Sequence, residues 1–307
     1  MQRRFIDYLI VSFKGIAMGA ADAVPGVSGG TIAFISGIYE ELITTISNIK
    51  PSLITVWKNE GFKAFWRAAN GSFLLALLTG IVVSFVSFMR LAKYLLEHHP
   101  VLIWSFFFGL ILASIYYVAK QITRWGILTL VAILIGALTA FYITTLPSMG
   151  ASDNGFFLFF AGAIAICAMI LPGISGSFIL VILGAYKTLS DAIHDFDFKR
   201  IAIFALGAVV GLLSFSRILK WLFKNYHNAT LALLSGFIVG SLNKVWPWKR
   251  VLSWRTDSEG LKVPFKEESV WPTDFSGEPQ VLYAIILMFA GFFTILILER
   301  LGSKNQI

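Results

Sequence analysis

Charged side chains are scarce in this sequence. Aspartate, glutamate, lysine and arginine together make up 14% of its 307 residues, whereas soluble domains contain about 25%. Hydrophobic residues account for 57% of the chain, and they gather in long runs. Runs of about 20 apolar residues cross the hydrocarbon layer of a membrane as helices. The composition therefore excludes a soluble globular protein and predicts an all-α, polytopic membrane protein.

Cysteine and histidine are also few. The single cysteine, Cys167, excludes a disulfide framework and a metal site built from cysteines. The four histidines lack metal-ligand spacings such as His-Glu-x-x-His. We therefore expect no metal, no cofactor and no catalytic residue. No run of basic residues favours nucleic acid as a partner, and the net charge of +8 is attributed to cytoplasmic loops of a membrane protein.

Two polar turns interrupt the apolar sequence. The first reads DAVPGVSGGT over residues 22–31, and the second reads LPGISGS over residues 171–177. Proline ends the helix before it and suits the first position of a new helix, and glycine lets a bound group approach the backbone. The helix that begins after each turn offers unpaired N–H groups and a positive dipole end to an anion.

Helix breaks at apolar depth are costly unless they line a cavity, so the two turns are the candidate substrate site. A second interpretation stays open, in which the turns are kinks that ease helix packing. The candidate binding residues in the turns are Gly26, Ser28, Gly29, Gly30, Thr31, Gly173, Ser175, Gly176 and Ser177.

The turns belong to an internal repeat. A shift of 147 residues aligns the first turn, Gly37 and Tyr39 with the second turn, Gly184 and Tyr186. A shift of 127 residues aligns 80–114 with 207–241 without a gap. Two ungapped blocks in one order indicate a duplicated unit.

Each repeat is predicted to contain a re-entrant helical hairpin followed by two spans. A broken spanning helix is the alternative to each hairpin. The predicted organisation is a first repeat at 1–125 (hairpin 9–46, amphipathic connector 47–70, spans 71–89 and 101–119), a linking span at 126–146, a second repeat at 156–246 (hairpin 156–190, spans 201–216 and 229–246), an extramembrane loop at 247–280 and a last span at 281–299.

The distribution of basic residues predicts the orientation, because cytoplasmic loops are rich in lysine and arginine. It favours a cytoplasmic amino terminus and a cytoplasmic connector at 47–70. Three predicted spans separate the hairpins, and this odd number gives the halves opposite topology. Inverted repeats whose broken helices meet near the midplane are typical of alternating-access transporters.

A few charged residues are further candidates. Arg90 and Arg217 lie at matched positions at the predicted ends of spans, where they either reach the interface as anchors or capture a phosphate. Asp22 precedes the first turn, where it caps a helix, binds a cation or carries a coupled proton. Glu40 and Lys187 occupy equivalent places and could form an ion pair in the coupling machinery.

The motifs GAADAVPGVSGGT at 19–31 and LPGISGS at 171–177 resemble the signatures of the bacterial polyprenyl-phosphate transporter family, over essentially the whole chain. The resemblance implies a multi-pass protein of the bacterial cytoplasmic membrane. It implies a flippase that returns undecaprenyl phosphate from the outer to the inner leaflet during cell-envelope synthesis, with this lipid as partner. The long 247–280 loop and the absence of an acid before the second turn depart from the family pattern.

Two other classes of function stay open. An anion channel or small-anion carrier also uses opposed helix N-termini. Undecaprenyl-diphosphate phosphatases carry similar turns on inverted repeats, but their turn continues with an arginine and they add a cluster of glutamates. Here Ser28 is followed by Gly29 and Ser175 by Gly176, so an enzyme is the weaker alternative. The sequence does not specify the coupling ion or the oligomeric state.

Overall fold

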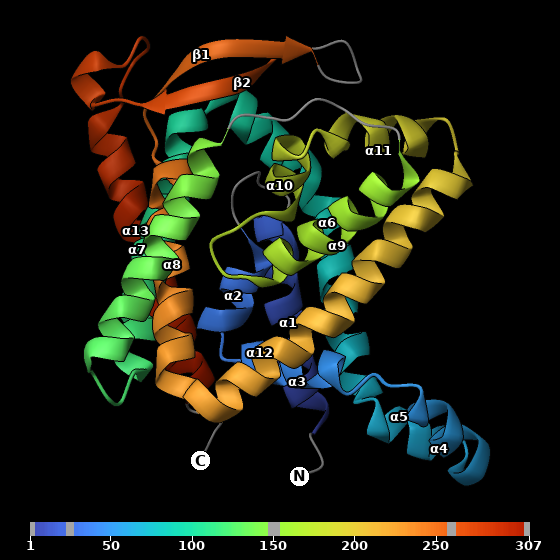
Figure 1. Ribbon diagram of the computed structural model, residues 1–307. Coiled ribbons are helices and arrows are strands. Elements are labelled where there is room, and N and C mark those ends of the chain that lie inside the picture. The colour runs from blue at the N-terminus through green and yellow to red at the C-terminus, as the bar shows by residue number, and fades with distance from the viewer. Residues whose placement is uncertain (1–3, 23–27, 147–153, 257–261, 304–307) are drawn as a thin grey trace.

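A computed structural model describes residues 4–22, 28–146, 154–256 and 262–303. The body is a packed set of helices, with one β-hairpin at an end (Figure 1). The amino terminus, α3, α4 and α5 lie at one end of the molecule, and α11 and the hairpin lie at the opposite end (Figure 1). The helices of the first half are α1 (Phe5–Asp22), α2 (Gly29–Ile35), α3 (Tyr39–Ser47), α4 (Ser52–Glu60), α5 (Phe62–Ala68), α6 (Gly71–His98), α7 (Pro100–Gln121) and α8 (Ile127–Thr145).

The second half is helical as far as Val245 and then changes character. Within the described residues, the two strands pair antiparallel and form the one sheet of the structure. The elements are α9 (Gly155–Ile170), α10 (Gly176–Ile182), α11 (Ala185–His194), α12 (Phe198–Ser241), η1 (Leu242–Val245), β1 (Lys249–Thr256), β2 (Lys262–Ser269), η2 (Pro272–Asp274) and α13 (Val281–Ser303).

The long helices make this a multi-pass membrane protein. In the described part of the chain, α7, α8 and α12 with its extension to Val245 are each long and apolar enough to cross a bilayer. Two bent pairs, α5 with the first part of α6 and α10 with α11, raise the number to five if each pair counts as one span. An apolar surface suits these helices, because exposed leucine, isoleucine and phenylalanine contact lipid tails as readily as protein.

Helix α12 consists of two arms joined by a kink. The sequence predicts spans at 201–216 and 229–246, and the backbone leaves helical geometry between these ranges, at Tyr226 (φ −136°, ψ 47°). The two arms run in different directions (Figure 1). The first arm continues through much of the polar link, because a helix does not need apolar side chains outside the hydrocarbon layer.

Helix α6 extends beyond its predicted span. The apolar run ends near residue 89, whereas the helix continues to His98. Leu95 and Leu96 pack against the core from this extension, which gives the last turns an apolar face. Arg90 and Arg217, predicted at the ends of spans, therefore both lie inside helices.

The same helix contacts recur in both halves. Gly80 of α6 lies so close to Ser12 of α1 that an added Cβ would strike its carbonyl oxygen, and Gly207 of α12 lies in the same way against Phe159 of α9. Gly80 matches Gly207 under the 127-residue shift, and position 12 matches position 159 under the 147-residue shift. The packing of α1 on α6 is thus repeated by α9 on the first arm of α12.

Helices α8 and α13 each pack on a helix that is distant in sequence. Gly136 of α8 touches the backbone of Leu233 in α12, and Gly291 of α13 touches that of Phe106 in α7. Phe106 and Leu233 are matched positions of the repeat. Helix α8 therefore contacts the second half and α13 contacts the first half, at matched positions of the repeat.

The segment after Val245 was predicted only as an extramembrane loop, and the β-hairpin in it was missed. Lys249, the first residue of β1, fastens this hairpin to the helices. Its Nζ donates to the Lys244 carbonyl oxygen at 2.5 Å and lies 4.2 Å from the centroid of the Trp104 ring of α7. Burial lowers the pKa of Lys249 to about 8, as desolvation disfavours the ammonium form.

Candidate functional site

The two turns meet in the interior of the molecule. The Ser28 hydroxyl donates to the Met169 carbonyl oxygen at 3.1 Å, and the Gly173 N–H donates to the Thr31 hydroxyl at 2.9 Å. Ser28 and Thr31 are both buried. Residues more than 140 positions apart are thus joined by hydrogen bonds. Gly26 of the predicted site lies outside the described residues.

The first turn is closed by protein acceptors. The Asp22 carboxylate accepts from the Gly29 N–H at 2.7 Å, and the Ser28 hydroxyl accepts from the Gly30 N–H at 3.1 Å. The Thr31 N–H donates to the Ser28 carbonyl oxygen at 3.0 Å. Asp22 therefore caps α2, one of the roles considered for it. The first three N–H groups of α2 all have acceptors from the chain.

Close fit also marks the first turn. A Cβ added to Gly30 would lie 2.5 Å from the Ile170 carbonyl oxygen and 2.9 Å from that of Met169. A Cβ added to Gly29 would strike the Asp22 carboxylate. These two glycines are needed because the first turn presses against the carbonyl groups that end α9 and against its own capping acid.

The second turn lacks a side-chain cap. Ser175 precedes α10 but makes no capping bond to that helix, and its hydroxyl pairs with that of Ser177 at 2.9 Å. Ser177 is exposed, whereas Ser175 is buried. Gly173 has a φ of +84°, and a Cβ there would lie 2.8 Å from the Phe237 carbonyl oxygen. The turn thus presents hydroxyls on a backbone that only glycine fits easily.

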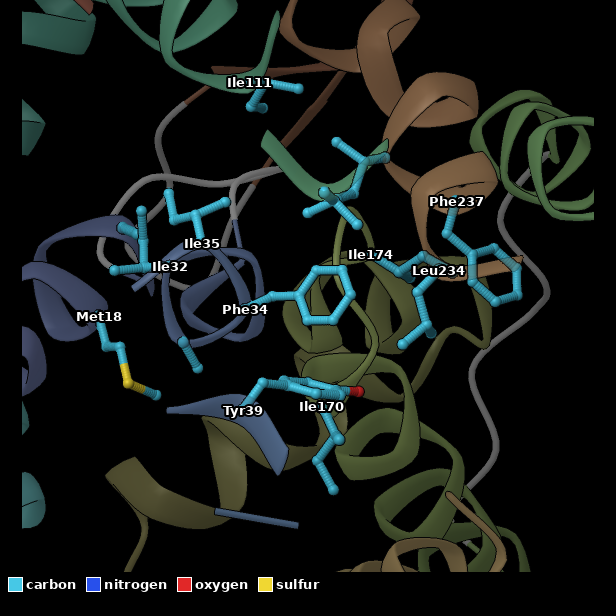
Figure 2. Packing of buried hydrophobic residues seen from close by; sticks show 14 of the residues in the cluster. Met18, Ile32, Phe34, Ile35, Tyr39, Ile111, Ile170, Ile174, Leu234 and Phe237 are labelled. Atoms are coloured by element: carbon cyan, nitrogen blue, oxygen red, sulfur yellow. The ribbon is translucent and has the colours of Figure 1, made fainter. Parts of the chain in front are cut away.

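An apolar shell surrounds the turns. Figure 2 shows Phe34 and Tyr39 of the first half facing Ile170, Ile174 and their neighbours from the second half. The Tyr39 ring is 2% exposed and packs edge-on against Phe34 at 4.9 Å between centroids. Among the described residues, its hydroxyl is the one buried side-chain polar atom without a hydrogen-bond partner. Water is excluded from this side of the turns, which strengthens electrostatic interactions there.

Among the described residues, the hydrogen bond of Arg217 is with the segment after α3 and not with the turns. Arg217 is exposed, and its Nη2 donates to the Ile49 carbonyl oxygen at 3.3 Å. One turn further along α12, the Lys220 ammonium donates to the Asn48 side chain at 2.8 Å. Arg90 lies in α6, and its side chain is outside the described part of the structure. Arg217 thus links α12 to the segment after α3.

The predicted pair of Glu40 and Lys187 is not what the structure brings together. The Glu40 carboxylate lies 3.0 Å from Nε2 of His227, on α12 just after its bend. Lys187 is exposed on α11, at the opposite end of the molecule from α3 (Figure 1). The sequence carries no signal for this contact of His227, because Glu40 lies 187 positions earlier in the chain. In the described part of the chain, no three histidine, cysteine, aspartate or glutamate residues cluster as metal ligands do.

The comparisons with known proteins agree with the motifs. The model of the VCA0040-like, undecaprenyl phosphate translocase-like family matches residues 18–263, which include both turns. The chain belongs to this family. A curated relative from Vibrio cholerae serotype O1, named polyprenyl-phosphate transporter, is 46% identical over 99% of this chain and 100% of its own length. A relative of the same name from Staphylococcus aureus is 34% identical over 76% of this chain and 84% of its own length.

No solved structure matches the chain. The geometry of the two joined turns therefore adds to what family membership says. Within the undecaprenyl phosphate translocase-like family, this chain has one turn closed by Asp22 and one turn without a side-chain cap.

Proposed function

We propose that this protein moves polyprenyl phosphate, in bacteria undecaprenyl phosphate, from the outer to the inner leaflet of the cytoplasmic membrane. The observation that carries the proposal is the contact of two polar helix breaks inside an apolar body, made by Ser28 with Met169 and by Thr31 with Gly173. The named activity of two relatives supports the choice of lipid. The phosphate head needs N–H and hydroxyl donors, while the prenyl tail stays in lipid.

The second turn is the better first receptor for the phosphate. Ser175 and Ser177 present hydroxyls there, and no side chain caps α10. At the first turn, the Asp22 carboxylate already holds the Gly29 N–H, so a phosphate must displace it. Two anions cannot share one donor, and the head is therefore admitted when Asp22 turns away, takes up a proton or binds a cation. This exchange is our proposal for ion or proton coupling.

The repeated contacts support an inverted repeat with re-entrant hairpins. The first hairpin, α1 to α3, belongs to the end that holds the amino terminus, and the second, α9 to α11, belongs to the opposite end (Figure 1). A site where oppositely directed hairpins meet can open to each face in turn. We place the amino terminus in the cytoplasm, because the basic residues of the connector at 47–70 favour that side.

The test is transport by the purified protein in vesicles. A fluorescent polyprenyl phosphate is placed in one leaflet, and an impermeant quencher reports how much has crossed. We expect crossing to depend on the protein and to change with an imposed pH or sodium gradient. Empty vesicles and a fluorescent polyprenol without phosphate are the controls.

Rival functions give different results in the same vesicles. Equal movement of chloride or of a tail-less prenyl phosphate would identify an anion carrier instead. Release of inorganic phosphate from polyprenyl diphosphate would identify a phosphatase. Either result would replace the proposed function.

A further inference from the structure

A groove of about 760 Å³ opens between the paired helices α4 and α5 and the long helices α6 and α12. We name it the interfacial groove. Its walls are apolar. Several of the residues that line it are exposed to more than half of their surface: Ile54 is 55% exposed, Leu75 is 57% exposed and Leu78 is 53% exposed. Leu213 of α12 closes the opposite wall. An exposed apolar surface of this size marks a binding site when something holds it in shape.

Two cations stand together at one end of the interfacial groove. They are Lys50 and Arg217, the charged residues among the described residues that line it. Arg217 donates one N–H to the carbonyl of Ile49, the residue before Lys50, so both cations lie at the same end. A guanidinium has five N–H donors in a planar fork. The bond to Ile49 therefore leaves donors that suit a phosphate oxygen.

The walls of the groove are tied in place. Besides the bond from Arg217, Lys220 donates to Asn48 at 2.8 Å, which fastens the segment after α3 to α12. The Trp66 indole donates to the Ser72 hydroxyl at 2.9 Å, which fixes α5 against the start of α6. The shape thus exists before a ligand arrives, and pre-formed sites lose less entropy on binding.

The position of the groove selects its occupant. Neither α4 nor α5 has a buried residue, and both carry basic side chains such as Lys58 and Arg67, as helices at a membrane interface do. If α4 and α5 lie at the membrane interface, the charged end of the groove faces water and its apolar length faces the acyl chains. The volume lies in the range of small-ligand pockets, roughly 300–1,000 Å³. It fits one apolar chain that ends in an anion, better than a two-chain phospholipid.

We propose that the interfacial groove binds the phosphate head and first isoprene units of a prenyl monophosphate as the lipid enters or leaves at the amino-terminal side. Lys50 and Arg217 hold the head, and Leu75, Leu78 and Leu213 hold the tail. The inference rests on the proposed function and adds a lateral station outside the central turns. The turns handle the head alone, whereas the groove recognises head and tail together.

The test uses the full-length protein in vesicles and a farnesyl monophosphate that carries a diazirine in its chain. After irradiation, mass spectrometry locates the labelled peptides. We expect labels on α4 and α6, reduced roughly tenfold in Lys50→Ala and in Arg217→Ala, which each remove a charge-assisted bond. Leu213→Trp, which fills the groove, should reduce labelling and polyprenyl phosphate transport together.

Two matched controls separate the groove from general effects. Leu206→Trp makes the same change on the same face of α12 two turns away, at a side chain that is 59% exposed. Lys58→Ala removes the same charge from α4 outside the groove. Both should label and transport like the parent.

The remaining outcomes distinguish a failure of the groove proposal from a failure of the proposed function. If the parent transports but Leu213→Trp and Lys50→Ala match it in labelling and transport, the groove proposal is wrong and the proposed function stands. Equal labelling by a diazirine phosphatidylglycerol would identify a general anionic-lipid site and overturn the proposal. If the parent does not transport, yet the farnesyl probe labels the groove in the expected variant pattern, the proposed function fails and the prenyl-phosphate site stands.

Discussion

The two turns differ in their side chains, although the backbone after them is alike at one matched position. Gly37 and Gly184, at matched positions after the turns, both have a φ of +73°. Asp22 caps the first turn, while its counterpart is Met169. Tyr39 is 2% exposed, and its counterpart Tyr186 is 41% exposed. The matched glycines thus keep one backbone conformation, whereas the first turn has a carboxylate cap and the second has no side-chain cap.

This difference suits a transporter that must release what it binds. Two equally strong phosphate sites would hold the lipid at the midplane. Under the proposed function, the Asp22 carboxylate competes with a phosphate for the Gly29 N–H, whereas no side chain caps the second turn. Unequal sites let binding at one turn be followed by exchange at the other.

The largest expected effect concerns topology. If the two halves have opposite orientations in the membrane, each position is labelled from one face and not from the other. Glu60→Cys on α4 and His194→Cys on α11 are exposed positions that belong to the two halves. In a Cys167→Ala background, an impermeant maleimide should label them from opposite faces of intact vesicles or cells. Labelling of both positions from one face contradicts the inverted repeat.

Glycine substitution should have the next largest effect. Gly173→Ala forces an alanine into a positive φ and places its Cβ 2.8 Å from the Phe237 carbonyl oxygen. We expect a loss of roughly 2–4 kcal/mol in unfolding free energy and no transport. Thermal unfolding in detergent and the vesicle assay measure both. Gly126→Ala is the control, because nothing lies within 4 Å of its added Cβ; a Gly173→Ala protein as stable as this control would contradict the fit.

Placing a carboxylate before the second turn should give that turn the cap that Asp22 gives the first. Met169 approaches Gly176 much as Asp22 approaches Gly29, with Cβ atoms 3.2 Å apart when one is built on Gly176. Met169→Asp should therefore close the second turn and weaken binding of a prenyl phosphate about ten- to a hundredfold, by repulsion and loss of N–H donors. Met169→Asn carries the acceptor without the charge and should bind more tightly than Met169→Asp.

The converse change acts on the first turn. Asp22→Asn keeps an acceptor for the Gly29 N–H but has no charge to repel a phosphate. We expect binding to tighten and the dependence of transport on pH or sodium to disappear. Transport by Asp22→Asn with the parent's ion dependence would leave Asp22 as a structural cap alone.

The smallest expected effect concerns the serines. Ser28→Ala removes a cap and a bond to Met169, so it should cost about 1 kcal/mol of stability. Ser175→Ala removes no bond to the backbone of α10 and should cost only a few tenths. Chemical unfolding of both variants measures the difference. Equal losses would mean that the second turn is capped as firmly as the first.

The sequence predicted the features that depend on local chemistry. Proline and glycine located both turns, and hydropathy located the long helices. It did not predict that the first arm of α12 stays helical through much of the polar link before the kink at Tyr226, because hydropathy reports lipid contact and not helix continuity. The hydrogen-bond partners of Ser28, Thr31 and Glu40 could not be predicted either, since each partner lies more than 140 residues away. Long-range pairing depends on packing, for which a single sequence carries little signal.

The packing of α13 against α7 determines the order in which the helices can assemble. Gly109 of α7 rests against Met288 of α13, which lies 179 positions later in the chain. At about 5–20 residues per second, the ribosome delivers α13 roughly 10 to 35 seconds after α7. During this interval, α7 has lipid, the insertion machinery or a provisional neighbour in place of its final partner. The last helix to be made therefore packs on the first half of the protein, and a chain that stops before Val281 leaves α7 without this partner.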